Sequence, residues 1–336
     1  MINNKGLLLT FVAAVASIFT ISLYWNDFAG TLKVNVSMDR QLALQSSSET
    51  AKSFDILPED LDQAVVYQFD SSLRNYVELK QGGRERFQNI IDNDIYSPYN
   101  WMVRSFKEGE IAELYVQFKP DGSPNGYVLK VPEEYKSKNL DEEDALSLVS
   151  SKINEHWSGN FEDYELIESS FMEMPNGRID HTFVYEHKLK DIGDAKYRLS
   201  ANVAGSIVSK INPYAFIPES FTREFANIRS DNNTIAAFAN YAFLGIYLLG
   251  IGLITVILFY RNGWLRWKKS LAAAAFIAFA SMLVDLNFAP SSMMYYDTAT
   301  SKSQFFTEQM LAVIANSVLN FLIIASSFIV AESLTR

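Results

Sequence analysis

The sequence has no cysteine, and only three of its 336 residues are histidine. Without thiols the chain forms no disulfide and no thiolate metal site, and it is compatible with an oxidising compartment. No HExxH, Walker or dinucleotide-binding glycine pattern occurs either. We therefore predict no catalytic, cofactor-binding or metal-binding set of residues within this chain.

Basic residues are in the minority in the long polar part of the chain. Residues 26–233 contain 35 acidic and 22 basic residues, a net charge of −13. Nucleic-acid binding depends on a basic surface, so this composition excludes nucleic acid as a partner.

Long apolar stretches, in contrast, are abundant. Four of them cover residues 7–25, 235–260, 270–288 and 310–330. A helix needs roughly 20 apolar residues to cross a bilayer core, and each stretch meets or approaches that length. We therefore predict a multi-pass α-helical membrane protein with four transmembrane helices in contact with the lipid bilayer. The first stretch could instead be a secretory signal, but residues 24–27 form no small-residue cleavage site, which favours an uncleaved anchor.

The distribution of basic residues predicts the orientation. The segment 261–269 contains Arg261, Arg266, Lys268 and Lys269 and no acidic residue. Short basic loops stay on the cytoplasmic side, so we expect both termini in the cytoplasm and residues 26–233 outside, in a bacterial inner membrane. The predicted parts are residues 1–25 with the first membrane helix, two extracytoplasmic units at 26–135 and 136–233, and residues 234–336 with the other three helices.

The extracytoplasmic part reads as one α+β module present twice. A helix is expected over residues 37–54 with Ser37 as its N-cap, and another begins after Asp141. The second helix has acidic residues in its first turn and one apolar stripe, the pattern of a helix that packs on a core. The stripe consists of Leu146, Val149, Ile153 and Trp157.

Alternating segments follow each helix and predict antiparallel strands. One covers residues 113–119 and another residues 197–203, and each half ends in a hydrophobic residue, proline and glutamate, at 131–133 and 217–219. A helix followed by a meander and the same ending, found twice, indicates a duplication. The pattern is similar to the PepSY type of periplasmic domain, a helix packed on an antiparallel sheet.

Polar residues outside the membrane offer no metal site. His181 and His187 share a face of one predicted strand but lie about 20 Å apart at roughly 3.3 Å per residue, and His156 lies near a helix end. The acidic pairs Glu133–Glu134 and Glu142–Glu143 are explained by solvation and by the helix dipole. The acidic cluster at residues 59–62 lacks the spacing of a calcium loop.

Inside the membrane, polar side chains are expensive and point to helix contacts or to a substrate path. Asp285 lies toward the outer end of the third helix, and Asn316 and Asn320 share one face of the fourth. We treat these three as the polar candidates of the membrane region, with hydrogen bonding between helices as the favoured role.

Six short strings, taken together and in order, resemble the N-terminal region of large bacterial members of the CPBP family, intramembrane endopeptidases related to type II CAAX prenyl proteases. They are SPYNW (97–101), RSFKEGE (104–110), RIDHTFVYE (178–186), NNTIA (232–236), YDTA (296–299) and AESLTR (331–336).

The resemblance implies a protease whose Glu-Glu-x-x-x-Arg motif and later histidines act on membrane helices. Here Glu332 and Arg336 have the family spacing, but Ala331 replaces the first glutamate and no predicted membrane helix contains a histidine. We therefore expect a helix end rather than a catalytic motif, and an inactive chain. A metal would belong only to a catalytic domain downstream of Arg336, of which this chain would be the front part.

Three functional hypotheses follow. The favoured one is the non-catalytic front part of a CPBP-like protease, with an extracytoplasmic domain that senses or presents substrate. The alternative is a stand-alone envelope sensor or adaptor that binds a peptide, lipid or protein partner. An open sheet edge or an aromatic groove at Tyr99, Trp101 or Phe106 would be a peptide site, but packing of these aromatics in the core is the favoured interpretation. A small transporter or assembly subunit is the third.

Overall fold

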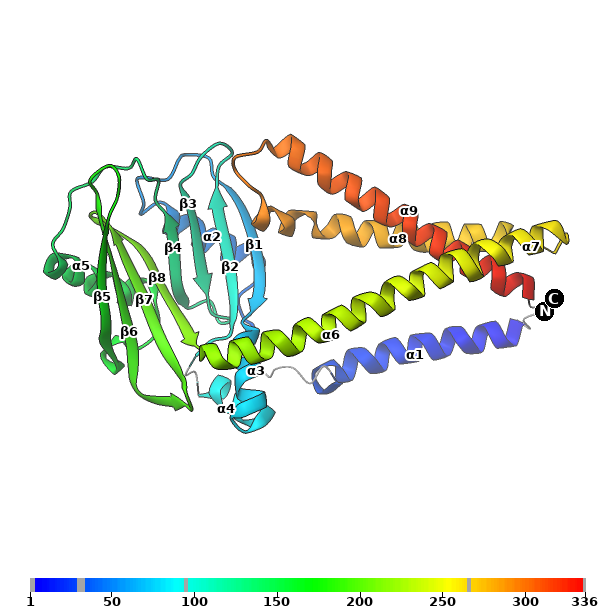
Figure 1. Cartoon of the computed structure of the whole chain (residues 1–336), viewed down its shortest axis with the longest axis horizontal. Coiled ribbons are helices and arrows are strands. Elements are labelled where there is room, and N and C mark those ends of the chain that lie inside the picture. The colour runs from blue at the N-terminus through cyan, green and yellow to red at the C-terminus, as the bar shows by residue number, and fades with distance from the viewer. Residues whose placement is uncertain (1–3, 29–33, 94–95, 265–266, 335–336) are drawn as a thin grey trace.

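The computed structural model describes residues 4–28, 34–93, 96–264 and 267–334. A sheet domain forms one end of the molecule, and long helices leave it in a common direction (Figure 1). The start of α1 (Asn4–Phe28) and the end of α9 (Lys302–Leu334) lie at the end of the molecule farthest from the sheet.

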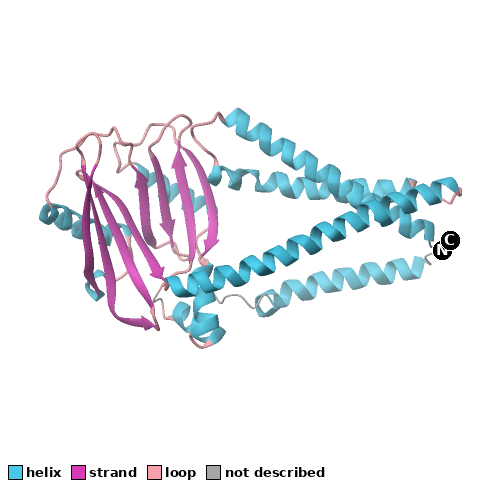
Figure 2. Ribbon diagram, in the orientation of Figure 1, coloured by secondary structure: helices cyan, strands magenta, loops and turns pink. Residues whose placement is uncertain are grey.

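Eight antiparallel strands form a single continuous sheet in the order β1-β2-β3-β4-β8-β7-β6-β5 (Figure 2). The first four strands and the last four each form a consecutive meander, and the two meanders join where β4 pairs with β8. The strands are β1 (Asp62–Phe69), β2 (Tyr99–Phe106), β3 (Glu113–Phe118), β4 (Pro124–Lys130), β5 (Tyr164–Glu173), β6 (Ile179–Ile192), β7 (Ala195–Ala204) and β8 (Ile207–Phe216).

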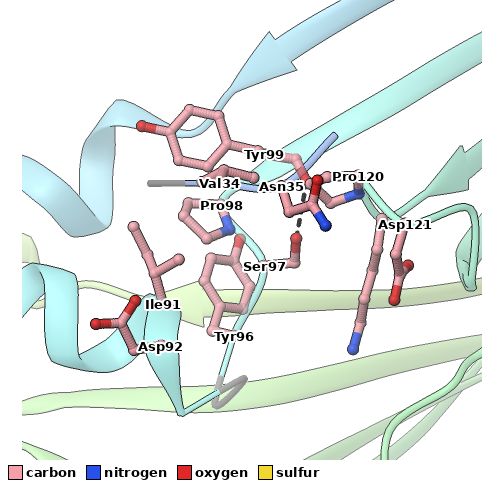
Figure 3. Close-up of a pocket in the computed structure, with 11 residues that line it drawn as sticks. Val34, Asn35, Ile91, Asp92, Tyr96, Ser97, Pro98, Tyr99, Pro120 and Asp121 are labelled. Carbon is pink, nitrogen blue, oxygen red and sulfur yellow. Dashed lines mark hydrogen bonds between the residues drawn. The ribbon is translucent and has the colours of Figure 1, made fainter. Parts of the chain in front are cut away.

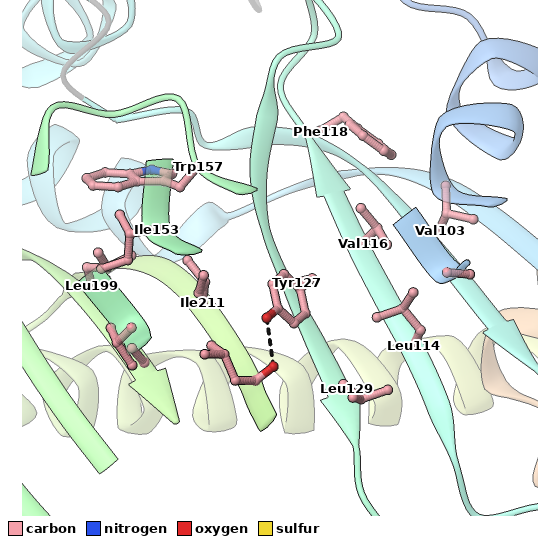
Figure 4. Close-up of a cluster of buried hydrophobic side chains, with 14 of the residues drawn as sticks. Val103, Leu114, Val116, Phe118, Tyr127, Leu129, Ile153, Trp157, Leu199 and Ile211 are labelled. Atoms are coloured by element: carbon pink, nitrogen blue, oxygen red, sulfur yellow. Dashed lines mark hydrogen bonds between the residues drawn. The ribbon is translucent and has the colours of Figure 1, made fainter. Parts of the chain in front are cut away.

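Two helices, α2 (Arg40–Ala51) and α5 (Glu142–His156), share one hydrophobic core with the sheet (Figure 4). Alternate residues of a strand point to the same face, and inward-facing apolar residues from β1 to β4 and from β6 to β8 line this core. Val149 and Ile153 of α5 are fully buried. The core thus spans both meanders, with fully buried strand residues that include Val103, Leu114, Phe183, Leu199 and Ile211.

Local signals set the helix starts. Asp141 caps α5 as predicted, and its carboxylate accepts a hydrogen bond from the Asp144 amide at 2.8 Å. The predicted cap at Ser37 is wrong, because α2 begins at Arg40 and the Ser37 hydroxyl donates to the Asp121 carbonyl in the β3–β4 loop. Instead Asp39 caps α2 by accepting from the Leu42 amide at 2.8 Å.

A helical pair, α3 (Ser71–Lys80) and α4 (Gly83–Asp92), is inserted between β1 and β2 and was not predicted. Its apolar face packs on the start of β7 and on the start of α6 (Glu219–Gly245), around Leu73, Tyr76 and Phe221. This insertion makes the first meander differ from the second, whose strands follow one another through short connections.

The prediction of a membrane protein with four spanning helices is wrong. Among the described residues, two helices are long and apolar enough to cross a bilayer, Lys268–Tyr295 and Lys302–Ser333. They contain α8 (Lys268–Ser292), the short η3 (Met293–Tyr295) and α9. The other two stretches yield only the shorter apolar helices Val12–Tyr24 and Gly252–Arg261, which fall below the roughly 20 residues that a bilayer requires.

The second of these stretches is also irregular. It begins in α6, continues through the π-helical segment η2 (Ile246–Ile254) and ends in α7 (Thr255–Arg261). The two predicted units share one sheet, because hydrogen bonds between β4 and β8 join their meanders.

Candidate functional site: the contact between the sheet and the α8–α9 hairpin

The turn between α8 and α9 is buried against the β1 end of the sheet. We call residues 293–301, which include η3, the turn, and α8, this turn and α9 together the hairpin. Met293, Met294 and Tyr296 of the turn pack on Ala64 of β1 and Phe106 of β2. The ring centroids of Tyr296 and Phe106 lie 5.6 Å apart, and Tyr296 is 1% exposed. The hairpin therefore packs on the sheet through a hydrophobic cluster of its own, separate from the main core; we call this cluster the apolar seat.

Arg104 on β2 lies at the centre of this contact. Its Nη1 atom donates to the carbonyl oxygens of Met293 (3.1 Å), Met294 (3.2 Å) and Tyr296 (2.6 Å). Its Nε and Nη2 atoms each lie 2.9 Å from Oε2 of Glu113 on β3. Each of the two side chains is only 4% exposed. One arginine thus joins two strands to the hairpin turn through charge-assisted hydrogen bonds, which are stronger than neutral ones.

The surroundings of Glu113 favour its ionised form. Burial raises the pKa of this carboxyl, but hydrogen bonds from Arg104 and Tyr115 and the charges of Arg104 and Lys130 outweigh burial and lower it below its ordinary value. The Tyr115 hydroxyl donates to Oε2 of Glu113 at 2.9 Å. Burial and this bond raise the pKa of Tyr115 to about 12. We call Arg104, Glu113 and Tyr115, with the three carbonyls of the turn, the Arg104 clamp.

The rim of the contact adds further links to the hairpin. Lys302, at the start of α9, forms an ion pair with Asp62 at the start of β1. The Gly109 amide donates to the Thr298 carbonyl at 2.8 Å, and the Thr298 hydroxyl lies 3.5 Å from Oε1 of Glu113. The β1, β2 and β3 strands therefore all hold the hairpin turn.

Two strings that carried the family resemblance meet at this contact. Arg104 begins the string 104–110 and Tyr296 begins the string 296–299, and they lie 192 residues apart in the sequence. A third string contains Arg178, whose guanidinium binds Asp180 and the carbonyls of Pro132 and Tyr135. The sequence did not predict that either arginine holds distant segments together. The partners of both include backbone carbonyls, which have no signature in a sequence.

A cavity of about 200 Å³ opens near the start of β2 (Figure 3). It is bounded by the end of α4, by Ser97 and Pro98 and by the β3–β4 loop. The Ser97 hydroxyl donates to the Tyr99 carbonyl at 2.8 Å, and the ring of Tyr99 points away from the cavity. Its charged lining residues are Asp92, Lys119 and Asp121.

The three histidines occupy packed positions. His156 stacks on Phe54 and lies edge-on to Tyr127, and burial lowers its pKa. Nε2 of His181 lies 2.9 Å from the Leu140 carbonyl oxygen, and the His181 ring stacks on Phe183. His187, on the same strand, is 8% exposed. Within the described residues no three histidine or carboxylate side chains are grouped to hold a metal ion.

The structure does not bring the membrane polar candidates together. Asp285 lies on α8, and Asn316 and Asn320 lie on α9. No hydrogen bond or ion pair links any two of them in the described part of the chain. The helix contact is made elsewhere, where the Ser270 hydroxyl donates to Oε2 of Glu332 at 2.5 Å. Arg336, the other residue of the family-like helix end, lies outside the described residues.

The aromatic residues named for a groove belong to the interior. Tyr99 and Phe106 are buried and Trp101 is half-buried against the core. We therefore take the Arg104 clamp as the candidate site among the described residues, and its role is to connect the sheet to the hairpin. Comparison with known proteins adds no assignment, since no family model, curated protein or solved structure matches the chain.

Proposed function

We propose that this chain is a non-catalytic sensing or presenting module of the membrane. In this proposal the sheet domain binds a partner, and the resulting movement of its strands displaces the hairpin. The observation that carries the proposal is the Arg104 clamp. Its three carbonyl partners belong to the turn of a helical pair long and apolar enough to cross a bilayer.

The Arg104 clamp would transmit motion from the sheet to the hairpin because its hydrogen bonds and ion pair are costly to break. Removing one partner of a buried, hydrogen-bonded ion pair destabilises a protein by about 3–5 kcal/mol. The apolar seat and the Lys302–Asp62 pair act in the same place. A rotation or shift of β1 and β2 would then move the start of α9 with it, rather than bend the turn.

The proposed location is the bacterial inner membrane, which the two long apolar helices of the hairpin would cross, with the sheet domain on the outer side. Support comes from the arrangement of the hairpin, because Lys268 at the start of α8 lies at the opposite end of that helix from the sheet. The chain has no native cysteine, so single cysteines report sidedness cleanly. Glu134→Cys should react with an impermeant maleimide in intact spheroplasts, and Asn262→Cys only after lysis. The reverse pattern would contradict the orientation.

The proposal keeps the CPBP-like protease as the system that this module serves, with a separate envelope partner as the alternative. Both leave the chain itself inactive. The contact between Ser270 and Glu332 supports this, because it gives the family-like glutamate a packing role between α8 and α9. Purified chain in nanodiscs should therefore not cleave a membrane-anchored fluorogenic peptide. Cleavage that Glu332→Gln abolishes would contradict a non-catalytic role.

The coupling itself can be measured with two spin labels, one in the turn after β4 at Glu134→Cys and one on α9 at Thr307→Cys. We expect a narrow distance distribution in nanodiscs that broadens when Arg104→Met is added. The matched control is Arg198→Met, which removes an arginine that pairs with Glu186 on the same sheet and touches no hairpin residue. Equal distributions in all three proteins would refute the transmission.

A further inference from the structure

The two edges of the sheet differ in how they are covered. The β1 edge lies beside the hairpin turn, which packs on Ala64 and Phe106. At the other end of the strand order, β5 pairs with β6 and with no other strand of the described residues. The edge of β5 is the part of the sheet farthest from the long helices (Figure 1). Alternate residues of β5 therefore direct N–H and C=O groups to the open side, where an extended peptide can add as a further strand.

The side chains of β5 are unusually exposed for an apolar strand. Phe171 is 71% exposed and Met172 66%, and Leu166 and Ile167 are 41% and 43% exposed. The register with β6 pairs Leu166 with Tyr185 and Phe171 with His181, so both residues lie on the face that carries the core. This face of the edge therefore offers apolar contact area next to the open backbone.

The opposite face of the same strand is acidic. Glu165 pairs with Glu186 and Glu168 with Val184 in the register, and a bulge between Leu166 and Glu168 keeps both glutamates on the face away from the core. Residues 161–173 contain five acidic residues and no basic one. An added strand would thus meet apolar side chains on one face and carboxylates on the other.

We propose that the β5 edge binds an extended peptide segment in which basic residues alternate with apolar residues. Backbone hydrogen bonds to β5 would supply affinity, apolar side chains would lie beside Leu166 and Phe171, and lysine or arginine would face Glu165 and Glu168. This inference names the partner class of the proposed sensing module and so rests on that proposal. A segment of nine residues matches the strand, at about 3.3 Å per residue.

A second copy of the chain fits this edge less well. Pairing two β5 strands would bring the three acidic residues of each strand into one short sheet segment, and like charges on facing strands destabilise the pairing. Natural edge strands use charge in this way to prevent self-association, and the bulge acts in the same sense. The same carboxylates attract a basic strand, so charge selects the partner.

The test uses the full chain in nanodiscs of zwitterionic lipid and a fluorescent nine-residue peptide of alternating lysine and valine. Anisotropy should show binding, and the β5 amides, residues 164–173, should become protected from hydrogen exchange. A glutamate–valine peptide of equal length should not bind. N-methylation of alternate lysine–valine peptide bonds should abolish binding, because it removes the donors that pair with β5.

The double variant Glu165→Lys, Glu168→Lys should weaken lysine–valine binding at least tenfold and accept the glutamate–valine peptide instead. Its matched control is Glu78→Lys, Glu85→Lys, two exposed acidic residues on α3 and α4, which should bind as the unaltered protein does. Equal loss in both variants, or protection outside β5, would overturn the proposal. So would a dimer that dissociates when Phe171→Lys is introduced, because a second copy would then occupy the edge.

This outcome is separable from that of the clamp. The Arg104→Met variant alters the opposite end of the strand order and should bind the peptide normally. Peptide binding without coupled motion would refute transmission and leave the edge site intact. Absence of binding, with a normal response of the hairpin to Arg104→Met, would refute the edge site alone.

Discussion

Replacing Arg104 by methionine should loosen the hairpin turn without unfolding the main core. Methionine retains an unbranched apolar stem but removes every donor. Three carbonyls of the turn then lose their partner, and Glu113 keeps the Tyr115 hydroxyl and the exposed Lys130. Breaking a buried pair in this way costs about 3–5 kcal/mol. At about 1.4 kcal/mol per tenfold change, the opening equilibrium of the turn should rise at least a hundredfold.

Hydrogen exchange of the turn, residues 293–301, measures this opening directly. In nanodiscs at neutral pH, these amides should exchange at least a hundredfold faster in Arg104→Met than in the unaltered protein, while core amides of β7 stay protected. Arg198→Met is the control and should leave the turn unchanged, because Arg198 pairs with Glu186 and stacks on Phe216. Unchanged exchange of the turn in Arg104→Met would refute the idea that the clamp holds the hairpin.

A double variant separates the charge effect from the loss of hydrogen bonds to the turn. Adding Glu113→Gln to Arg104→Met removes the uncompensated buried carboxylate, so part of the protection should return. The carbonyls of Met293, Met294 and Tyr296 would still lack their donor. Complete recovery would show that the turn carbonyls do not need Arg104, and no recovery would show that the buried charge contributes little.

Three further predictions concern stability. The pKa of Glu113 is lowered in the folded protein, so its contribution to stability is present above the ordinary carboxyl pKa and is lost as pH falls through the folded pKa. The protection of the hairpin turn from hydrogen exchange should therefore fall on acidification below about pH 4. This loss should be smaller in Glu113→Gln. Ile153→Ala should lower the free energy of unfolding of the sheet domain by about 2–5 kcal/mol, because the side chain is fully buried, whereas a loss below about 1 kcal/mol in chemical denaturation would contradict its core position. Asp141→Ala should cost about 1 kcal/mol by removing the cap of α5, and Asp141→Asn should restore most of it in the same assay.

Periodicity predicted the parts of this fold that local chemistry determines. The cap at Asp141 and the stripe through Val149 and Ile153 depend on residues within a few turns of one another, and both lie where they were expected. The limits of α2 were less accurate, because the Ser37 hydroxyl bonds to the Asp121 carbonyl, more than eighty residues away, and does not cap the helix. Such a competing partner is not visible in a local window.

The site was harder to predict than the fold. Arg104 stands in an alternating strand between Val103 and Ser105, where a solvent-facing arginine is the ordinary expectation. Its burial depends on the hairpin turn folding back onto β1 and β2, and its partners there are carbonyls that any sequence would offer. The membrane polars were more conspicuous in the sequence, yet the structure does not bring Asp285 near enough to Asn316 or Asn320 for a hydrogen bond.

If the β5 edge receives a partner and the β1 edge holds the hairpin, the signal must cross the seam between β4 and β8. That seam is short, with Tyr127 opposite Ile211 and Val128 opposite Lys210. Gly126 lies beside it with φ of +100°, and a Cβ atom there would come within 2.2 Å of the Ile211 carbonyl. The backbones at the seam thus approach as closely as glycine permits.

The seam is reinforced from the core side. The Tyr127 hydroxyl donates to the Val208 carbonyl at 2.7 Å, and α2 and α5 pack on the core that both meanders share. Two long meanders joined by few strand pairs could hinge at this point, but a common core resists that motion because close-packed interiors transmit displacement rather than absorb it. Transmission from β5 to the Arg104 clamp therefore depends on the packing of α2 and α5 as much as on hydrogen bonds between strands.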